Sequence, residues 1–317
     1  MSRRRETDAQ LLARIGLDAV ARRERARQNH NRLVALAFMA PALVLVIGVL
    51  LVPVGYNLYL SVMNWRKFKG FDQFAGAGNY FDMGSSPYFF DALANTAIWV
   101  AASLAFPIAI GLALALLFRG ARFEDAFKNI VFLPRILAPT AVAVLWIYVY
   151  APHGVVNRIL QMVLGHDVDI GWLYQQSTIT ASIIVTFVWQ TVGLVMVLLL
   201  LGLNALPKDP IEAARIDGAS PFQSFRHIVL PLLAPTLLMV SILCVLAGFT
   251  VFDLLWVMGA GYPGLRTLSL AIFMYFEAFQ KGGWSFGSAA AVIIGLIVLS
   301  VTWLQAWLQH RIDQSLK

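Results

Sequence analysis

The chain has 317 residues, of which 59% are hydrophobic and only 13% are charged. A soluble globular domain is about half apolar and about a quarter charged, so this composition excludes an ordinary soluble domain and indicates an integral membrane protein. The formal net charge is +7. In a membrane protein, the first explanation for an excess of basic residues is topology, because Lys and Arg gather in cytoplasmic loops. We therefore expect lipid, and no nucleic acid, around this chain.

The first 32 residues carry nine arginines and four acids. This charge is typical of a secretory signal, but the apolar stretch of such a signal is only about 7–15 residues long. The apolar run that follows here, over residues 33–62, is long enough to span a bilayer with tilt. We therefore predict an uncleaved cytoplasmic tail over residues 1–32, in contact with solvent or the lipid surface.

Six segments are apolar over the length of about 20 residues that a bilayer core requires. They are residues 33–62, 92–118, 130–150, 179–203, 232–258 and 286–308. The predicted fold class is all-α, a polytopic membrane protein with six transmembrane helices. A shorter apolar stretch over residues 267–279 contains Glu277 and is expected to be re-entrant, interfacial or part of the approach to the sixth helix.

The Lys and Arg residues predict the orientation. With the N-terminus inside, the inner segments hold 18 of these residues and the outer loops hold six. This asymmetry places both termini in the cytoplasm. The predicted organisation is a basic tail (residues 1–32), a transmembrane domain (33–308) and a cytoplasmic C-terminal tail (309–317).

The loop over residues 204–231 contains start and stop signals for two short helices. For the first helix, Asp209 is the expected cap, Pro210 takes the first helical position and Glu212 the third. Gly218 is expected to end that helix in the left-handed conformation.

Ser220, Pro221 and Gln223 repeat the start signal for a second helix of about eight residues, after which Pro231 is expected to begin the return to the membrane. Helices this short are unstable alone in water. The pattern therefore predicts a preformed helix pair that docks against another surface.

This loop resembles the EAA loop of binding-protein-dependent ABC importer permeases. The family pattern is Glu-Ala-Ala, three residues, Gly, nine residues and Ile-x-Leu-Pro. The corresponding residues of this chain, with the adjoining acid, are Glu212, Ala213, Ala214, Asp217, Gly218, Ile228, Leu230 and Pro231. The resemblance implies that the loop fits a cleft on a separate ATPase subunit and transmits its closure to the helices.

The resemblance extends over about residues 33–308 and is greatest to carbohydrate-type permeases related to the larger membrane subunit of the maltose importer. It is carried by residues 74–80, by Asn95 and Thr96, and by residues 249–258. Many family members have Arg where Thr250 stands here. The resemblance implies a place in a bacterial inner membrane. It also implies a second, related permease, an ATPase dimer that holds ATP and Mg²⁺, and an extracytoplasmic solute-binding protein, with no cofactor bound by this chain.

Polar and aromatic side chains within the spans and the shorter apolar stretch are candidates for the substrate path. They are Trp189, Gln190, Asp253, Trp256 and Tyr275. An aromatic face beside an amide suits a sugar, whose C–H face stacks while its hydroxyls form hydrogen bonds. The alternatives are a packed tryptophan and an interhelical amide bond for Trp189 and Gln190, and a helix-end carboxylate paired with Arg266 or with an interfacial amide for Asp253. For Trp256 and Tyr275 the alternative is a place in an interface or in the core.

Three function classes can be compared. An enzyme requires a convergent catalytic set, and the sequence shows none; the five histidines are scattered without metal-ligand spacing. A stand-alone secondary transporter or channel predicts ion-coupling carboxylates or broken helices near the membrane midplane. An importer permease explains the loop over residues 204–231. The sequence contains no phosphate-binding loop that ends in Gly-Lys-Ser/Thr, so ATP would bind to another chain.

Overall fold

The computed structural model describes residues 34–66, 70–259, 264 and 267–315, in two compact units that divide between Tyr59 and Leu60. The predicted basic tail lies outside the described residues. The first unit is one apolar helix, formed by residues 34–45, the π-helical turn η1 (Val46–Leu51) and α2 (Val52–Ser61), whose last two residues belong to the second unit. A proline ring clashes with the carbonyl four residues earlier. For Pro53 that residue is Val49, inside η1, where the wider turn relieves the clash.

The second unit begins with a small antiparallel hairpin, β1 (Met63–Arg66) and β2 (Gly70–Phe74), followed by α3 (Gly78–Gly84). The hairpin departs from the predicted all-α class. The other elements are α4 (Pro87–Phe118), α5 (Glu124–Ile136), α6 (Pro139–Val149), α7 (Val155–Leu164), α8 (Ile179–Asn204), α9 (Asp209–Ile216), α10 (Pro221–Ser224), η2 (Phe225–Val229), α11 (Leu230–Thr250), α12 (Asp253–Met258), α13 (Leu270–Tyr275), η3 (Phe276–Gln280) and α14 (Trp284–Ser315).

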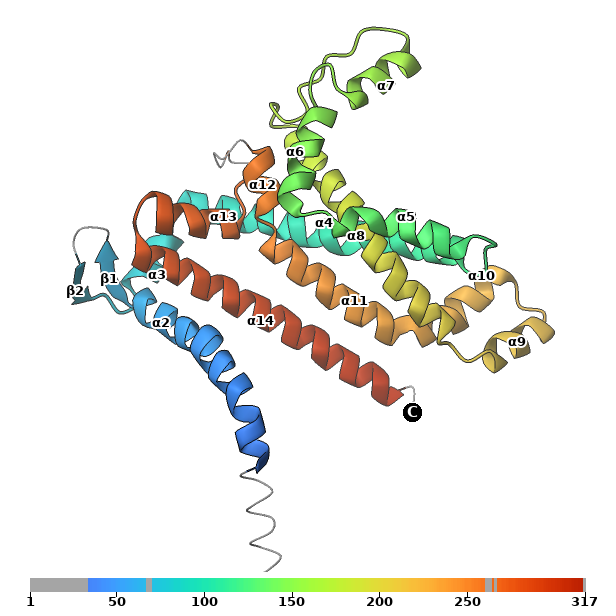
Figure 1. Cartoon of the computed structure of the whole chain (residues 1–317), viewed down its shortest axis with the longest axis horizontal. Coiled ribbons are helices and arrows are strands. Elements are labelled where there is room, and N and C mark those ends of the chain that lie inside the picture. The colour runs from blue at the N-terminus through green and yellow to red at the C-terminus, as the bar shows by residue number, and fades with distance from the viewer. Residues whose placement is uncertain (1–33, 67–69, 260–263, 265–266, 316–317) are drawn as a thin grey trace, which may run out of the picture. The chain divides into compact units, whose positions relative to one another are not determined.

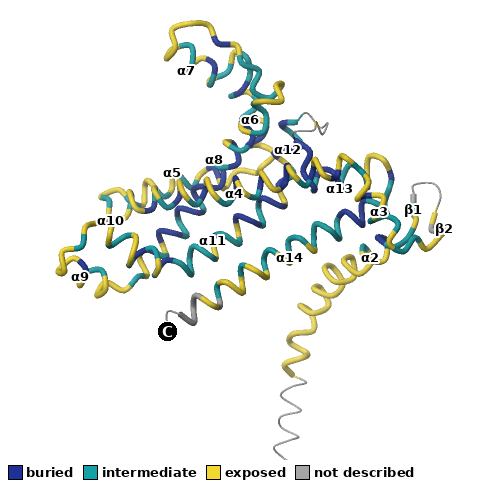
Figure 2. Tube along the Cα trace, turned by 180° about the vertical axis from the view of Figure 1, so that it is seen from behind, coloured by how far each residue is buried: buried dark blue, intermediate teal, exposed yellow. Residues whose placement is uncertain are grey.

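Helix α8 is the centre of the second unit. In the most apolar 18-residue stretch of α8, 67% of the residues are buried, against 28% in that of α4 and 22% in that of α14. Figure 2 shows dark blue residues along α8. It packs against α4, α5 and α11. Small residues allow these backbones to approach closely: a Cβ on Gly193 would lie 2.1 Å from the Val131 carbonyl oxygen of α5.

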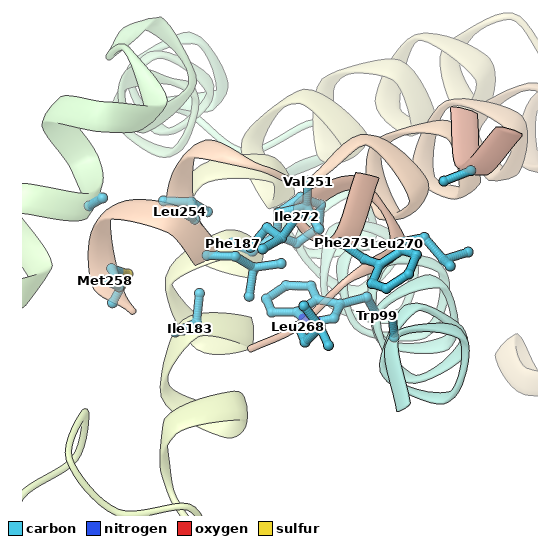
Figure 3. Packing of buried hydrophobic residues seen from close by; sticks show 14 of the residues in the cluster. Trp99, Ile183, Phe187, Val251, Leu254, Met258, Leu268, Leu270, Ile272 and Phe273 are labelled. Atoms are coloured by element: carbon cyan, nitrogen blue, oxygen red, sulfur yellow. The ribbon is translucent and has the colours of Figure 1, made fainter. Parts of the chain in front are cut away.

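Two clusters of buried apolar side chains form the core. Figure 3 shows the first, in which Trp99 of α4 meets Phe187 of α8 edge to face at 6.0 Å, beside Leu268 and residues of α12 and α13. The second joins α4, α8 and α11 nearer to α9 and includes Met196 and Leu233. Side chains from segments far apart in sequence therefore hold the bundle together at both ends.

The third predicted span, over residues 130–150, is wrong as a single helix. It consists of α5 and α6, which meet at an angle of 98°. Leu137 and Ala138 are extended at the break, just before Pro139. The Leu137 carbonyl accepts a hydrogen bond of 3.1 Å from the side-chain amide of Gln190 on α8. A neighbouring helix thus satisfies a backbone group at a proline-associated break.

The other spans fall on helices, with changes at their ends. The fifth is interrupted at Val251 and Phe252, between α11 and α12. Helix α14 begins at Trp284 and continues to Ser315, into the predicted C-terminal tail. The shorter apolar stretch forms α13 and η3, which pack against α14. By length and composition, the described residues contain five helices able to cross a membrane, or six if the bent pair counts as one span.

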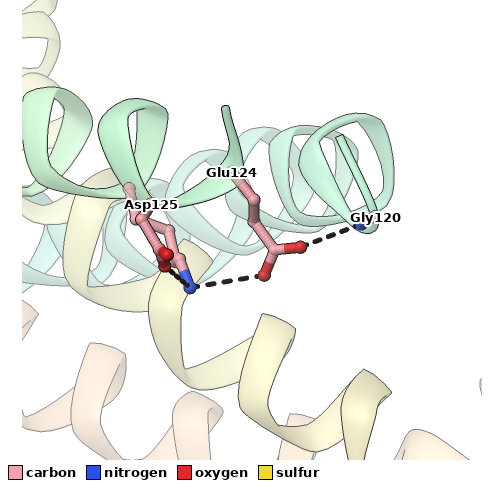
Figure 4. Close-up of polar contacts among 4 residues, drawn as sticks. Gly120, Glu124 and Asp125 are labelled. Carbon is pink, nitrogen blue, oxygen red and sulfur yellow. Dashed lines mark hydrogen bonds and ion pairs between the residues drawn. The ribbon is translucent and has the colours of Figure 1, made fainter. Parts of the chain in front are cut away.

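A polar turn joins α4 to α5. Gly120 is left-handed, with φ +73°, and its N–H donates to the Glu124 carboxylate at 2.9 Å. The Lys128 ammonium forms ion pairs with Glu124 at 3.3 Å and with Asp125 at 2.7 Å. Figure 4 shows these contacts at the start of α5. Acids in the first turn of a helix interact favourably with its dipole, so local charges fix where α5 begins.

Candidate functional site

Helix α9 has the predicted stop signal but not the predicted cap. Lys208 occupies the capping position, and no side-chain hydrogen bond caps the helix. Because Lys208 is already in the helical region, Asp209 is the first helical residue, and its prediction as the cap is wrong. Gly218 is left-handed with φ +80°. The N–H groups of Gly218 and Ala219 return to the carbonyls of Arg215 and Ala214, which is the hydrogen-bond pattern of a Schellman motif.

The predicted start of the second helix is confirmed. The Ser220 hydroxyl accepts from the Gln223 N–H at 3.3 Å, and the Gln223 side chain accepts from the Ser220 N–H at 2.8 Å, which completes a capping box. The predicted length of about eight residues is wrong, since α10, η2 and α11 form one helix that continues through Pro231. The residue four before Pro231 is His227, inside η2, where the wide turn accommodates the proline ring.

The apolar residues of this segment divide into two sets. Ile211 and Phe225 pack against the second core cluster, and Ala214 is buried. By contrast, Ile216 is 86% exposed and Phe222 is 68% exposed. The first set therefore packs against the bundle, and the second set lies on the outside of the helix pair.

The exposed residues define what we call the α9–α10 surface. It consists of Glu212, Ala213, Ile216, Asp217 and Phe222, all of which are exposed. Of the other motif residues, Ala214 is buried, Ile228 and Leu230 are partly buried within the helix, and Pro231 is exposed. Figure 1 shows α9 and α10 together at one end of the bundle, beyond the ends of α8 and α11.

The substrate-path candidates lie in two places, near the middle of α8 and in α12 and α13. Trp189 meets Trp146 of α6 edge to face at 5.6 Å, and Gln190, only 4% exposed, makes the bond to the Leu137 carbonyl. Trp256 and Tyr275 meet edge to face at 5.1 Å. The structure thus brings two candidates of α12 and α13 together and gives Gln190 a contact that joins α8 to the α5–α6 break.

Asp253 begins α12 directly after the break in the fifth span and is exposed. Its carboxylate lies in the first turn, where negative charge is favoured, and shares a helix face with Trp256, three residues later. Arg266, the expected ion-pair partner, lies outside the described residues. The position combines an exposed acceptor with a neighbouring aromatic face.

Sequence reasoning missed that the aromatic residues near α12 form a continuous series. Its members, which we call the aromatic ladder, are Trp256, Phe252, Tyr275, Phe279, Trp284 and Trp65. Neighbouring rings in the series are 5.2–5.7 Å apart between centroids. The spacing of four between Phe252 and Trp256, and between Tyr275 and Phe279, was the only signal in the sequence.

Comparison with known proteins identifies the family. The model for binding-protein-dependent transport system inner membrane components matches residues 105–314. The chain belongs to this family. A probable ABC transporter permease of Bacillus subtilis (strain 168), YurN, is 30% identical over 87% of this chain and 96% of its own. The trehalose/maltose transport system permease MalF of Thermococcus litoralis is 31% identical over 83% of this chain and 88% of its own.

The fold also matches a solved transporter. A bacterial ABC transporter involved in the import of the acidic polysaccharide alginate matches with a TM-score of 0.77 and 21% identity, over 90% of this chain and 99% of the other. A second crystal structure, of a bacterial alginate ABC transporter with its pentasaccharide-bound periplasmic protein, matches with the same TM-score and identity, over 90% and 97%. At this identity the likeness shows the shared fold.

Family membership decides between the two transport mechanisms. Among its described residues the permease has two broken spans, at Leu137–Ala138 and at Val251–Phe252, and broken helices were expected of a secondary transporter. The breaks therefore do not discriminate between the mechanisms. The family match does, and the chain is an ABC transporter permease, the inner membrane component of a binding-protein-dependent transport system.

Proposed function

We propose that this permease forms half of the translocation pathway for a sugar or sugar-like solute, coupled to an ATPase on separate chains. The sugar class is supported by the trehalose/maltose permease among its relatives and by the alginate importer that shares its fold. The exposed Asp253 and the aromatic faces of Trp256 and Tyr275 suit a solute that stacks and forms hydrogen bonds.

The coupling proposal rests on the α9–α10 surface. Ile216 and Phe222 lie exposed on a helix pair whose inner side is already packed, and exposed apolar groups rimmed by charge are typical of protein interfaces. We assign this surface to the ATPase, which holds ATP and Mg²⁺. The Glu212 and Asp217 carboxylates supply charge at the rim.

The proposed assembly has two further parts, which come from the resemblance to importer permeases. A second, related permease completes the pathway, and a solute-binding protein delivers the sugar at the bundle end that holds α12 and α13. The α9–α10 surface and both termini then face the cytoplasm, in agreement with the distribution of Lys and Arg.

The test is co-purification with a tagged ATPase, followed by measurement of ATP hydrolysis stimulated by the binding protein. Glu212→Lys combined with Gly218→Asp reverses a surface charge and places a side chain at a left-handed residue. We expect loss of the ATPase or of stimulation. Phe222→Asp is expected to cause the same loss, because it places a charge in the apolar part of the interface.

Asp125→Lys is the matched control. Its side chain is 92% exposed and lies in the first turn of α5, in a segment also predicted to be cytoplasmic but outside the α9–α10 surface. Unchanged assembly and stimulated hydrolysis in both the double variant and Phe222→Asp would refute the coupling assignment. A loss in Asp125→Lys as large as in Phe222→Asp would show a general charge effect instead.

A further inference from the structure

A polar pocket of about 480 Å³ lies at the bundle end opposite the α9–α10 surface. The hairpin, α3, η3 and the start of α14 enclose it. Its chemistry comes from Asn64, Trp65, Asp82, Glu277, Lys281 and Ser285. The volume falls within the range of about 300–1,000 Å³ that small-molecule sites occupy, and the function proposed above does not use this pocket.

The walls of the pocket are held by contacts that leave its functional groups in place. The backbone N–H of Trp65 donates to the Ser285 hydroxyl at 2.7 Å, which ties β1 to α14. The Asn79 side chain donates to the carbonyls of Ser61 and Met63 at 2.8 and 2.9 Å, which ties α3 to the start of the hairpin. The site is therefore built from segments more than 200 residues apart in sequence.

Hydrogen-bonding groups of both kinds line the pocket. Lys281 donates to Glu277 at 2.5 Å, so a donor and an acceptor stand side by side. Asp82 and Asn64 also line the pocket and are exposed. Paired donors and acceptors of this kind match the vicinal hydroxyls of a sugar, each of which both donates and accepts.

An aromatic face completes the set. Trp65 lines the pocket and meets Trp284 at 5.2 Å between ring centroids, which makes it the last member of the aromatic ladder. The ladder continues through Phe279 and Tyr275 to Trp256 on α12. The pocket thus adjoins a continuous series of rings that leads to the proposed substrate path.

We propose that this pocket is a carbohydrate subsite, in which the Trp65 indole stacks on a sugar ring while Glu277, Lys281 and Asp82 bind its hydroxyls. The inference rests on the proposed sugar class and adds a second binding position. The ladder gives the sugar aromatic contacts between the pocket and α12.

The test is a binding titration of the full chain in lipid nanodiscs, without binding protein or ATPase. Saturation-transfer NMR would follow maltose, trehalose, lactose and a glucuronic acid disaccharide. Trp65→Ala is expected to weaken binding of the responding sugar about fivefold, because it removes a stacking face, whereas Trp65→Phe keeps an aromatic face and stays within about twofold. Glu277→Gln, which keeps the shape but removes the charge, is expected to weaken binding about fivefold.

Phe81→Ala is the control, because Phe81 is an exposed aromatic residue of α3 outside the pocket lining. Binding that is unchanged in this variant, weakened in Trp65→Ala and Glu277→Gln, and retained in Trp65→Phe supports the subsite. No saturation transfer from any of the four sugars, or equal binding by all variants, overturns it. Sugar uptake by the assembled complex is measured separately, so uptake without binding to the pocket overturns the subsite and leaves the proposed function standing.

Discussion

The α9–α10 segment and the α5–α6 break both interrupt the helices of this permease, but different interactions hold them. Residues within five positions of one another fix the first, through the Gly218 turn and the Ser220 capping box. The second depends on Gln190, which is 53 positions away from Leu137. Local interruptions can therefore be read from neighbouring residues, whereas an interruption supported by another helix cannot.

The largest expected effect comes from filling the contact between α5 and α8. Gly193→Ala places a methyl group 2.1 Å from the Val131 carbonyl oxygen and 2.7 Å from Phe132 Cα. Both contacts are with backbone, so the helices have to separate, at a cost of about 3 kcal/mol. We expect a much lower midpoint of thermal unfolding in detergent. Gly295→Ala is the control, since its Cβ would meet no atom within 4 Å; equal midpoints for the two variants would contradict the predicted close approach.

A smaller loss is expected when the support of the α5–α6 break is removed. Gln190→Leu eliminates the hydrogen bond to the Leu137 carbonyl, and such bonds between membrane helices contribute about 1 kcal/mol. The midpoint of thermal unfolding reports the change. Thr191→Val is the matched control, because the buried Thr191 hydroxyl has no hydrogen-bond partner among the described residues. If both variants unfold alike, the amide bond does not stabilise the break.

The third effect is expected to be confined to the α9–α10 segment. Ser220→Ala removes the capping box and is expected to destabilise the start of α10 by about 1 kcal/mol. Faster hydrogen exchange at residues 221–229 would report it, with little change in global unfolding. Asp209→Ala provides the comparison, because Asp209 makes no side-chain cap and loses only a dipole interaction of about 0.3–1 kcal/mol. Faster exchange in Asp209→Ala than in Ser220→Ala would reverse our assignment of the caps.

The smallest effect is expected at the exposed start of α5. Lys128→Met removes the ion pairs with Glu124 and Asp125, and exposed pairs are worth about 0–1 kcal/mol. Any loss of thermal stability should become smaller in about 1 M salt, where the screening length falls to about 3 Å. Arg122→Met, which removes a cation from the same loop, is the control. A salt-independent loss in Lys128→Met would point to packing by its side chain instead of charge.

Sequence periodicity and turn chemistry predict much of this molecule. All six apolar segments fall on helices, and the Gly218 stop and Ser220 start signals act within one turn of the chain. The relationship to importer permeases could also be recognised from residues 204–231. These features depend on residues close in sequence, so one sequence suffices to read them.

Other features could not be predicted because they depend on contacts between distant segments. The 98° bend requires α8 to supply Gln190 beside Leu137, and the hairpin is tied to α14 through Ser285. The aromatic ladder joins Trp65 to Trp284 across most of the chain. Asp209 was assigned wrongly for a different reason, since a shift of one residue in where a helix begins changes which side chain can cap it.

The π-helical turn η2 makes α10 and α11 a single rod. A hinge at Pro231 would absorb motion, but a continuous helix transmits it. Helix α11 has 21 residues, and at about 1.5 Å per residue it reaches about 30 Å, from the end of η2 to the break at Val251 and Phe252. A displacement of Phe222 would therefore tilt α11 as one body and move its other end, where the chain continues into α12.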